Sequence, residues 1–320
     1  MEFGFGFHTQ SPISDPTSMR TVAVRGEELG FDYMAFPEHI VAPRAYTSVH
    51  PSSETGRLPA MTKGYFLDSL TVMTYVAAVT TKPRLMPTVM VVPYRPAVMT
   101  AKMLATMDVL SGGRVTVGCG VGWLEEEFEA LGTPPYVERG KVTDEYLRAF
   151  KELWTSDNPS MSGDHVSFSD IVFEPKPAQN PHPPIFIGGE SAPAMRRIVE
   201  HGDGWFPMGT NPRNRMDTPA LYRANVERLH ALAEERGRDP ASIQLGYFAQ
   251  WHGLGEDLKA ADGSRHLFSG SAEDIAGDIE FFCEMGGGLL FFRFFSPTLG
   301  ETLDRMERHA ADLLPLVRNQ

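Results

Sequence analysis

The chain has 320 residues, and its 42% hydrophobic content is enough for a large buried core in one or two domains. Its formal net charge of -12 argues against nucleic acid as the main partner, so an anionic ligand would have to meet local basic residues or backbone N–H groups. Cys119 and Cys283 are too few for a disulfide scaffold and lack metal-ligand spacing, and we interpret both as small buried residues.

Short apolar runs alternate with longer amphipathic runs in the first half of the chain, which indicates strands alternating with helices. The predicted strands are Phe3–His8, Phe31–His39, Arg84–Val92 and Ser111–Gly120, and the predicted helices are Thr17–Leu29, Asp68–Thr80, Ala97–Leu110 and Val137–Trp154. Gly30 follows the first of these helices, where a C-terminal glycine is expected.

The second half continues the same alternation. Its predicted strands are Pro184–Gly189, Asp203–Met208, Ser242–Gln250 and Gly288–Phe295, each followed by a predicted helix, at Ala192–His201, Pro219–Gly237, Ala272–Met285 and Leu299–Leu314. Eight strand and helix pairs with right-handed crossovers predict the α/β class and favour a closed (β/α)8 TIM barrel, with a doubly wound sheet as the alternative.

Two long segments fit none of these pairs. Val41–Phe66 and Asp157–Gln179 are rich in Pro, Ser and Gly, and we predict that both are insertions on the face of the barrel that carries the active site. No linker, low-complexity tract or repeat marks a domain boundary, which predicts one domain over residues 1–320. The first residues lack the features of a signal peptide and no apolar run is long enough to cross a membrane, so we expect a cytoplasmic protein with no membrane partner.

The stretch GCGVGWLEEEFEALG, residues 118–132, joins a predicted buried strand to an acidic helix. Its glycines, Gly118, Gly120 and Gly122, match neither the G-x-G-x-x-G fingerprint nor a P-loop. They could let a planar ligand lie against bare backbone, and a sharp turn with close packing is the alternative. We interpret the acids Glu125–Glu127 as a solvated helix start, placed at the positive end of the helix dipole.

Five blocks of sequence resemble a known family. They are RGEELGFDYMAFPEH, VVPYRPAVMTAK, LSGGRVTVGCGVGWLEEEFEALG with the following ERG, EPKPAQNPHPPIFIGGESAPAMRR, and HGDGWFPMG. In this order they span nearly the whole chain and resemble the bacterial-luciferase-like flavin and deazaflavin oxidoreductases, especially the subgroup that uses coenzyme F420. The resemblance implies a (β/α)8 barrel with a flavin or deazaflavin ring in its mouth.

Under this resemblance, IFIGGES becomes a phosphate site at the passage from a strand into a helix. Backbone N–H groups and the helix N-terminus would face the phosphate together, although a simple glycine turn is the alternative. The residues predicted to contact the cofactor here are Gly188, Gly189, Glu190, Ser191, Met208, Gly209 and Thr210. Arg213 and Arg215 are near enough in sequence to assist, or they belong to the solvated surface.

His39 follows Glu38 at the expected carboxyl end of a strand, which is the catalytic rim of a barrel. An imidazole there can hold a proton near neutral pH while a hydride leaves or arrives at the ring. In matching positions the deazaflavin dehydrogenases carry an acid and a histidine, so the resemblance implies catalytic roles for Glu38 and His39, with His8 as the second histidine candidate. A capping or core histidine is the alternative for His39.

Two positions depart from the sugar-phosphate dehydrogenases of the family. Pro43 stands where those enzymes often carry tryptophan, and Trp123 stands where they carry an acid. Both departures argue against a sugar-phosphate substrate.

Family members also carry a non-proline cis peptide at the position of Thr88 and Val89, where it supports one face of the ring. The resemblance therefore implies that Thr88 and Val89 contact the cofactor. Arg95 and Arg293 could face an anionic substrate or the polyglutamate tail of a deazaflavin, or they could form ordinary salt bridges.

The resemblance implies an F420-dependent oxidoreductase that transfers a hydride between a deazaflavin and a small organic substrate. The alternatives are a monooxygenase that uses reduced FMN and, from another class, a flavin-binding barrel without catalytic activity. The substrate is not identified, no metal is expected, and a homodimer is the expected assembly.

Overall fold

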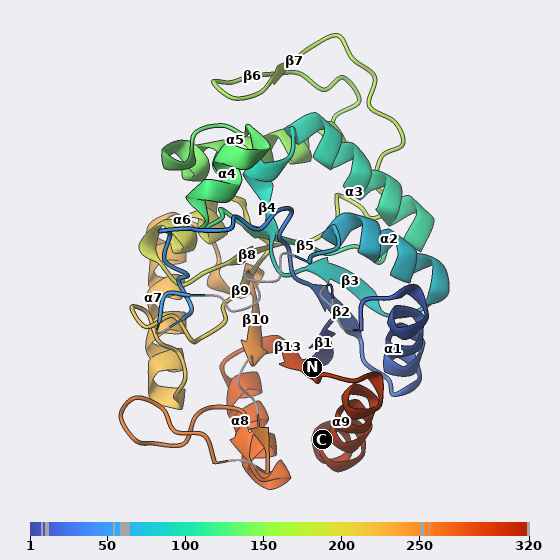
Figure 1. Cartoon of the computed structure of the whole chain (residues 1–320). Helices are drawn as coiled ribbons and strands as arrows, with labels where there is room; N and C mark the ends of the chain where they lie inside the picture. Colours follow the sequence, from blue (N-terminus) through green and yellow to red (C-terminus); the bar gives the residue numbers. More distant parts are fainter. Residues whose placement is uncertain are drawn as a thin grey trace.

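The computed structural model describes residues 1–7, 9, 13–53, 55–57, 65–249, 253–255 and 257–318. Parallel strands form the centre of the molecule and helices surround them (Figure 1). The strands of the central sheet are β1 (Glu2–Gly6), β2 (Tyr33–Phe36), β3 (Arg84–Pro87), β4 (Met90–Val91), β5 (Val117–Gly120), β8 (Ile185–Gly188), β9 (Gly204–Phe206), β10 (Gln244–Ala249) and β13 (Gly287–Arg293).

The sheet closes into a barrel because β3 and β4 are two parts of one run. The spatial order is β3-β2-β1-β13-β10-β9-β8-β5-β4, so the two ends of the sheet are β3 and β4. Only Thr88 and Val89 separate them, and a parallel bridge between Leu85 and Val115 also joins β3 to the segment before β5. Nine strand segments therefore make eight barrel positions, which confirms the predicted (β/α)8 barrel and excludes an open doubly wound sheet.

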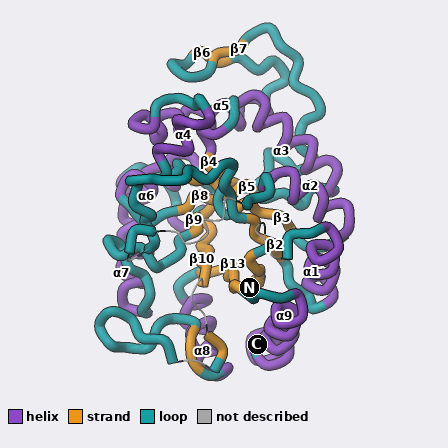
Figure 2. The backbone as a smooth tube through the Cα atoms, in the orientation of Figure 1, coloured by secondary structure: helices purple, strands orange, loops and turns teal. Residues whose placement is uncertain are grey.

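Helices follow the strands on the outside of the barrel (Figure 2). The longer ones are α1 (Pro16–Glu28), α2 (Ser69–Val79), α3 (Ala97–Ser111), α5 (Arg139–Thr155), α6 (Ala192–His201), α7 (Pro219–Glu235), α8 (Ala272–Glu284) and α9 (Leu299–Asp312), and the short ones include α4 (Glu125–Leu131) and α10 (Leu314–Arg318). Several helices have side-chain N-caps. Asp15 accepts hydrogen bonds from the backbone N–H groups of Thr17 and Ser18 at the start of α1, and Ser271 forms a capping box with Asp274 at the start of α8.

Large apolar side chains fill the barrel interior. Phe291 of β13 is fully buried there, with its ring edge-on to those of Tyr33 and Phe206. Gly4 of β1 makes room for it, because a Cβ at Gly4 would lie 2.5 Å from the Phe291 ring. A glycine in β1 is thus explained by the packing of an aromatic side chain from the neighbouring strand.

The two predicted insertions lie at opposite ends of the barrel, so one of the two placements was wrong. The described part of Val41–Phe66 follows β2 and runs over the carboxyl ends of the strands (Figure 1). The other segment follows α5, contains the hairpin of β6 (Met161–Ser162) and β7 (Ser167–Phe168), and leads into β8. At its end Gln179 accepts a hydrogen bond of 2.7 Å from Arg84, the first residue of β3. A segment between a helix and the next strand returns to the amino ends of the strands, away from the catalytic face.

The two cysteines also differ, which corrects a second expectation. Cys119 is fully buried in β5, as predicted, but Cys283 is exposed on α8. Its neighbour Phe282 faces the core, and a rotation of about 100° per helical residue turns the next side chain outward. Within the described residues, no helix has both the length and the apolar character needed to cross a membrane.

Candidate active site

His39 lies at the carboxyl end of β2 and is held by an acid from another part of the chain. Its Nδ1 lies 2.8 Å from Oε2 of Glu127, which belongs to α4. The His39 side chain is 11% exposed, whereas that of Glu127 is 0% exposed. The ring of Phe66 lies 5.1 Å from the His39 ring. The sequence singled out His39 but not its partner.

Glu127 makes four hydrogen-bond contacts with two segments, the residues His39–Val41 and the turn that ends at Tyr94. Its Oε1 accepts from the backbone N–H groups of Ile40, at 2.6 Å, and Val41, at 3.1 Å, while Oε2 faces His39 and accepts from the Tyr94 hydroxyl at 2.8 Å. The interpretation of the acids as a solvated helix start is therefore wrong for Glu127. It is valid for Glu125, which is exposed.

The hydrogen bonds around Glu127 favour its ionised form. Burial alone would raise the pKa of Glu127, but hydrogen bonds from His39, Ile40 and Tyr94 outweigh burial and hold the pKa below its usual value. Burial and the neighbouring Glu127 carboxylate raise the pKa of the Tyr94 hydroxyl. Tyr94 is therefore a neutral hydrogen-bond donor to this carboxylate.

Glu38, the one acid predicted to be catalytic, is buried and both of its oxygens accept hydrogen bonds. Its Oε1 accepts from Ser69 and from Arg95, both at 2.8 Å, and its Oε2 accepts from the Val91 backbone N–H at 2.5 Å. Burial raises the pKa of Glu38, while Arg95 and the hydrogen bonds act in the opposite direction. Arg95 also pairs with Asp68, so of its two predicted roles the structure supports the ion pair. These contacts make Glu38 a residue that joins β2, α2 and β4.

Aromatic rings surround His39 on the side of the loop after β2. The Trp123 ring lies 6.0 Å from that of His39, 4.8 Å from that of His50 and 5.9 Å from that of Tyr46. Burial and the neighbouring His39 lower the pKa of His50 to about 4, so His50 is neutral near pH 7. Trp123 thus connects the end of the glycine stretch to the loop that crosses the barrel mouth.

The glycines of residues 118–122 are explained by packing against β3 and β4. A Cβ at Gly118 would lie 2.0 Å from the Pro87 carbonyl oxygen, one at Gly120 would lie 2.3 Å from the Val89 side chain, and one at Gly122 would lie 2.7 Å from Phe128. A side chain at any of the three positions would therefore meet protein atoms. Close packing, the alternative, accounts for these glycines, and their contact with a cofactor stays a prediction.

The peptide bond between Thr88 and Val89 is cis, as the resemblance implied. Val89 then fits against two glycines of neighbouring strands, because a Cβ at Gly120 or Gly188 would lie 2.3 or 3.0 Å from its side chain. The bulge between β3 and β4 therefore lies against the carboxyl ends of both β5 and β8.

The loop after β8 leads into α6 as the predicted phosphate site requires. Gly189 has a φ of 95°, and its carbonyl oxygen accepts a hydrogen bond of 2.8 Å from the Trp205 indole. Ser191 is the N-cap of α6, and its hydroxyl accepts from the Ala194 N–H. A Cβ at Gly189 would meet only Ala194, at 3.5 Å, so this glycine borders open space, unlike those of the glycine stretch.

Glu190, one of the predicted cofactor contacts, binds the backbone of two others, Met208 and Gly209. Its buried carboxylate accepts hydrogen bonds from the backbone N–H groups of Met208, at 2.9 Å, and Gly209, at 3.4 Å, and from the Asn211 side chain. Those two N–H groups are therefore engaged within the protein, and contact of Met208 and Gly209 with a cofactor stays a prediction. Burial raises the pKa of Glu190. Glu190 joins the loop after β8 to the loop after β9.

Thr210 supplies the observation that fits a bound ligand. It is 9% exposed, and its hydroxyl is buried with no hydrogen-bond partner within the described part of the chain. An unsatisfied buried hydroxyl costs about 1–3 kcal/mol, so such groups usually have a partner. The Thr210 hydroxyl follows β9, and Gly189 and the first N–H groups of α6 follow β8, so these groups lie in the loops after two paired strands.

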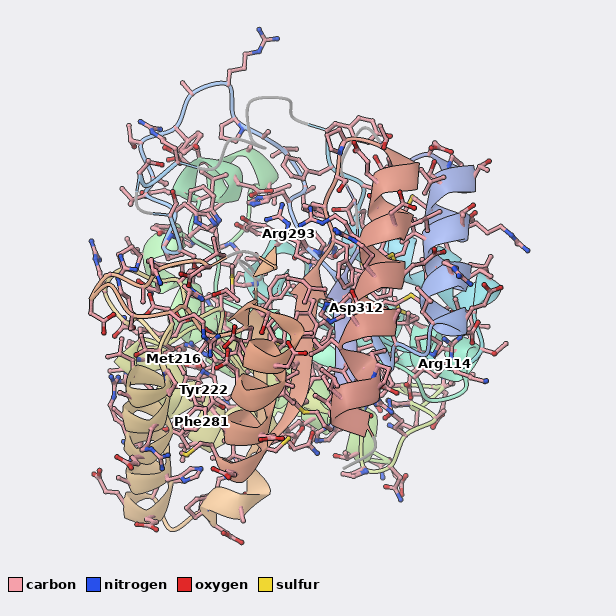
Figure 3. The ribbon with its side chains drawn as sticks, turned by 90° about the horizontal axis from the view of Figure 1, so that it is seen from below. Arg114, Met216, Tyr222, Phe281, Arg293 and Asp312 are labelled. Atoms are coloured by element: carbon pink, nitrogen blue, oxygen red, sulfur yellow. The ribbon has the colours of Figure 1, made fainter. Side chains whose placement is uncertain are left out.

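The remaining residues that the sequence suggested for the site include His8, Arg293 and Arg215. His8 lies outside the described residues. Arg293 lies at the tip of β13 in the upper part of Figure 3, over the Phe295 ring at 3.8 Å, and burial with the nearby Arg305 lowers its pKa to about 10. Arg215 pairs with Asp217 at 3.2 Å. In the described residues, no three His, Cys, Asp or Glu side chains gather as metal ligands would.

Sequence reasoning missed Glu127 and Tyr94. Helical periodicity did not single out Glu127, because Glu125, three residues before Phe128, is closer in angle to Phe128 than Glu127 is. In the structure Glu127 and Phe128 are buried while Glu125 faces outward. Tyr94 lies in a short 3-10 turn, Val92–Tyr94, for which the sequence carries no signal either.

A closed parallel barrel with a histidine and an unsatisfied polar group at the carboxyl ends of its strands has the architecture of a barrel enzyme. The sequence matches the luciferase-like monooxygenase family over residues 1–309. The chain belongs to this family, whose members are monooxygenases and related oxidoreductases, and it is therefore an enzyme of that kind. Membership counts against the alternative of a barrel without catalytic activity.

Individual relatives differ in cofactor. The chain is 36% identical to the FMNH2-dependent dimethylsulfone monooxygenase of Pseudomonas putida over 191 residues, which is 58% of this chain and only half (50%) of that enzyme's length. It is 32% identical to an uncharacterised protein of Mycobacterium tuberculosis, with 80% of this chain and 89% of the relative covered. An F420-dependent secondary alcohol dehydrogenase, solved with an F420-acetone adduct, shares the fold with a TM-score of 0.75 and 18% identity, covering 99% of each chain. Reduced FMN and F420 thus both occur among similar proteins.

Proposed function

We propose that this protein is an F420-dependent oxidoreductase that exchanges a hydride with a small organic substrate. The observation that carries the proposal is the His39 ring, fixed by Glu127 at the carboxyl end of β2 and thus at the same end of the barrel as the loops after β8 and β9. The loop after β2 also reaches the β9 loop, since the Ser52 hydroxyl lies 4.0 Å from the Met208 sulfur. A proton-carrying group and a cofactor anchor therefore border one mouth.

In this proposal, separate residues bind the cofactor, move the proton and exclude water. A bound deazaflavin would supply or accept the hydride. The N-terminus of α6, Gly189 and the Thr210 hydroxyl would hold a phosphate group of the cofactor. Because the His39 Nδ1 is engaged by Glu127, Nε2 is the nitrogen that would give a proton to the substrate when it receives the hydride, or take one when it loses the hydride. Trp123 and the loop after β2 keep water from the reacting groups.

The choice of F420 depends on sequence resemblance in two blocks, GWLEEEFEALG and ERGKVTDEYLRAFKELW. A second candidate is a monooxygenase that uses reduced FMN, and the 36% identity to the Pseudomonas putida enzyme favours it. The geometry around His39 and Thr210 is compatible with both, because each cofactor carries a phosphate and a tricyclic ring.

Anaerobic spectral titration with F420 and with FMN separates the two candidates, followed by measurement of oxygen uptake. We expect tight binding of F420 and substrate turnover without oxygen consumption. His39→Ala should lower turnover by on the order of 10² while cofactor affinity changes by no more than a few fold. Tight binding of FMN with oxygen uptake would replace the proposal by the monooxygenase, and a fully active His39→Ala would remove His39 from either mechanism.

A further inference from the structure

The two oxygens of the Glu127 carboxylate make different kinds of contact: one contacts backbone N–H groups, and the other contacts side chains. Oε1 accepts from two backbone N–H groups, those of Ile40 and Val41, and so anchors the loop after β2. Oε2 contacts two side chains, the His39 ring at Nδ1 and the Tyr94 hydroxyl. Anchoring of the loop would be complete with Oε1 alone, so the Oε2 contacts require a separate explanation.

An ionised carboxylate only accepts hydrogen bonds. Since three donors, from Ile40, Val41 and Tyr94, already converge on Glu127, the fourth contact is satisfied when the His39 Nδ1 also donates. The neutral ring then carries its hydrogen on Nδ1 and leaves Nε2 as the nitrogen that gains or loses a proton.

We propose that Glu127 is a positioning residue that sets the tautomer and orientation of His39, so that Nε2 faces the reacting molecules. This inference rests on the proposed function only for its catalytic consequence, because the tautomer belongs to the cofactor-free protein. The buried carboxylate serves the same purpose as the acid of a hydrolase triad, with Tyr94 as a second donor that keeps Oε2 in place.

Glu127→Gln gives a sharp test because the backbone determines how the new amide lies. The Ile40 and Val41 N–H groups require an acceptor, so the glutamine oxygen takes the Oε1 position and its NH2 group takes the Oε2 position. That NH2 group donates to the His39 Nδ1. The variant should therefore reverse the tautomer and place the hydrogen on Nε2.

The measurement is long-range proton–nitrogen NMR on cofactor-free protein with labelled histidine, at about pH 8.5, where ordinary histidine rings are neutral. His39→Gln identifies the His39 signals among those of the 10 histidines. We expect a protonated Nδ1 in the wild type and a protonated Nε2 in Glu127→Gln. A hydrogen on Nε2 with none on Nδ1 in the wild type overturns the proposal, and this result needs no variant to fold.

Two variants provide matched controls. Glu125→Gln makes the same chemical change at the exposed acid of the same helix and should leave the His39 signals unchanged. Tyr94→Phe removes the other side-chain donor to Oε2 but keeps the carboxylate, so the hydrogen should stay on Nδ1. If Tyr94→Phe reverses the tautomer as Glu127→Gln does, the proposed role of the Glu127 charge is wrong.

Turnover with the bound cofactor then tests the consequence. Glu127→Gln should lower kcat by on the order of 10² or more and change KM by less than a few fold, because the misplaced hydrogen blocks Nε2 and not substrate binding. A reversed tautomer with wild-type kcat supports Glu127 as the residue that positions His39 and overturns the proposed function, in which His39 moves the proton. An unreversed tautomer with reduced kcat overturns the positioning role and leaves the proposed function in place.

Discussion

The two sides of the barrel mouth differ in how completely their polar groups are satisfied. On the side of β2 and β5, both oxygens of Glu38 and both oxygens of Glu127 have protein partners. On the side of β8 and β9, the Thr210 hydroxyl is buried without a partner in the described residues, and Gly189 borders open space. The two acids of the first side are satisfied within the protein, whereas on the second side the Thr210 hydroxyl would gain a partner from a ligand.

This difference indicates which polar groups contribute to the free energy of unfolding and which contribute to ligand affinity. A buried polar group with its partners in place contributes to folding, and removal of one partner costs the desolvation of the other. A buried group without a partner reduces stability until a ligand satisfies it. Substitutions at Glu38 and Arg95 should therefore act on the free energy of unfolding, and substitutions at Thr210 should act on ligand affinity.

The largest effect is expected when the buried charge pair is broken. Arg95→Met leaves Glu38, whose side chain is 0% exposed, without its cation, and should lower the free energy of unfolding by about 3 kcal/mol. Urea denaturation followed by fluorescence measures this. The double variant Arg95→Met with Glu38→Gln should recover part of the loss, because a neutral side chain needs no cation. A loss below about 0.5 kcal/mol in the single variant would show that this side does not depend on the pair.

The opposite result is expected at Thr210. Thr210→Val keeps the shape of the side chain but removes the unpartnered hydroxyl, so the free energy of unfolding should stay the same or rise by up to about 1 kcal/mol. Cofactor affinity should fall about tenfold, the equivalent of one hydrogen bond to phosphate. Spectral titration gives the Kd and denaturation gives the stability. Lower stability with unchanged Kd would break the comparison, since Thr210 would then behave like the satisfied acids of the first side.

The smallest effect concerns the loop that crosses between the two sides. Burial acts to raise the pKa of Glu126, but hydrogen bonds from Thr47 and Ser48 lower it to about 2. The folded pKa is thus below the ordinary value of 4.5, so the contribution of Glu126 is complete above about pH 4.5 and is lost as the pH falls through about 2.

Hydrogen exchange at the Thr47 and Ser48 amides tests this expectation. Protection of both amides should fall over that pH window in the wild type and should be lower and independent of pH in Glu126→Gln, with global stability nearly unchanged. Glu125→Gln provides the control, because that acid faces solvent. Equal protection in Glu126→Gln and the wild type would mean that other contacts hold the loop.

Much of the architecture was predictable because it depends on local patterns. The alternation of apolar and amphipathic runs predicted the strands and helices, and right-handed crossovers then left the barrel as the favoured closure. Boundaries were less accurate where short elements intervene. The predicted helix Val137–Trp154 begins at Arg139, after a 3-10 turn at Tyr136–Glu138, and α4 precedes it as a separate helix.

Charge patterns were a poorer guide to the site. Three adjacent acids looked like a solvated helix start, yet Glu125 faces solvent, Glu126 binds the crossing loop and Glu127 is buried against His39. Composition also could not tell the loop across the mouth from the segment at the other end of the barrel. The order of elements could have done so, because Asp157–Gln179 follows a helix and precedes a strand.

The sequence alone determined the strands and helices, their order, the barrel and the family, because these follow from periodicity, handedness and motifs within short stretches. It also placed His39 and the β8 loop at the catalytic end, since both follow strands. Only the tertiary structure decided which groups are satisfied there. His39 and Glu127 are 88 residues apart in the sequence, and closure of the barrel brings Nδ1 and Oε2 to 2.8 Å. Contacts of this kind depend on how distant segments pack, which no local pattern records.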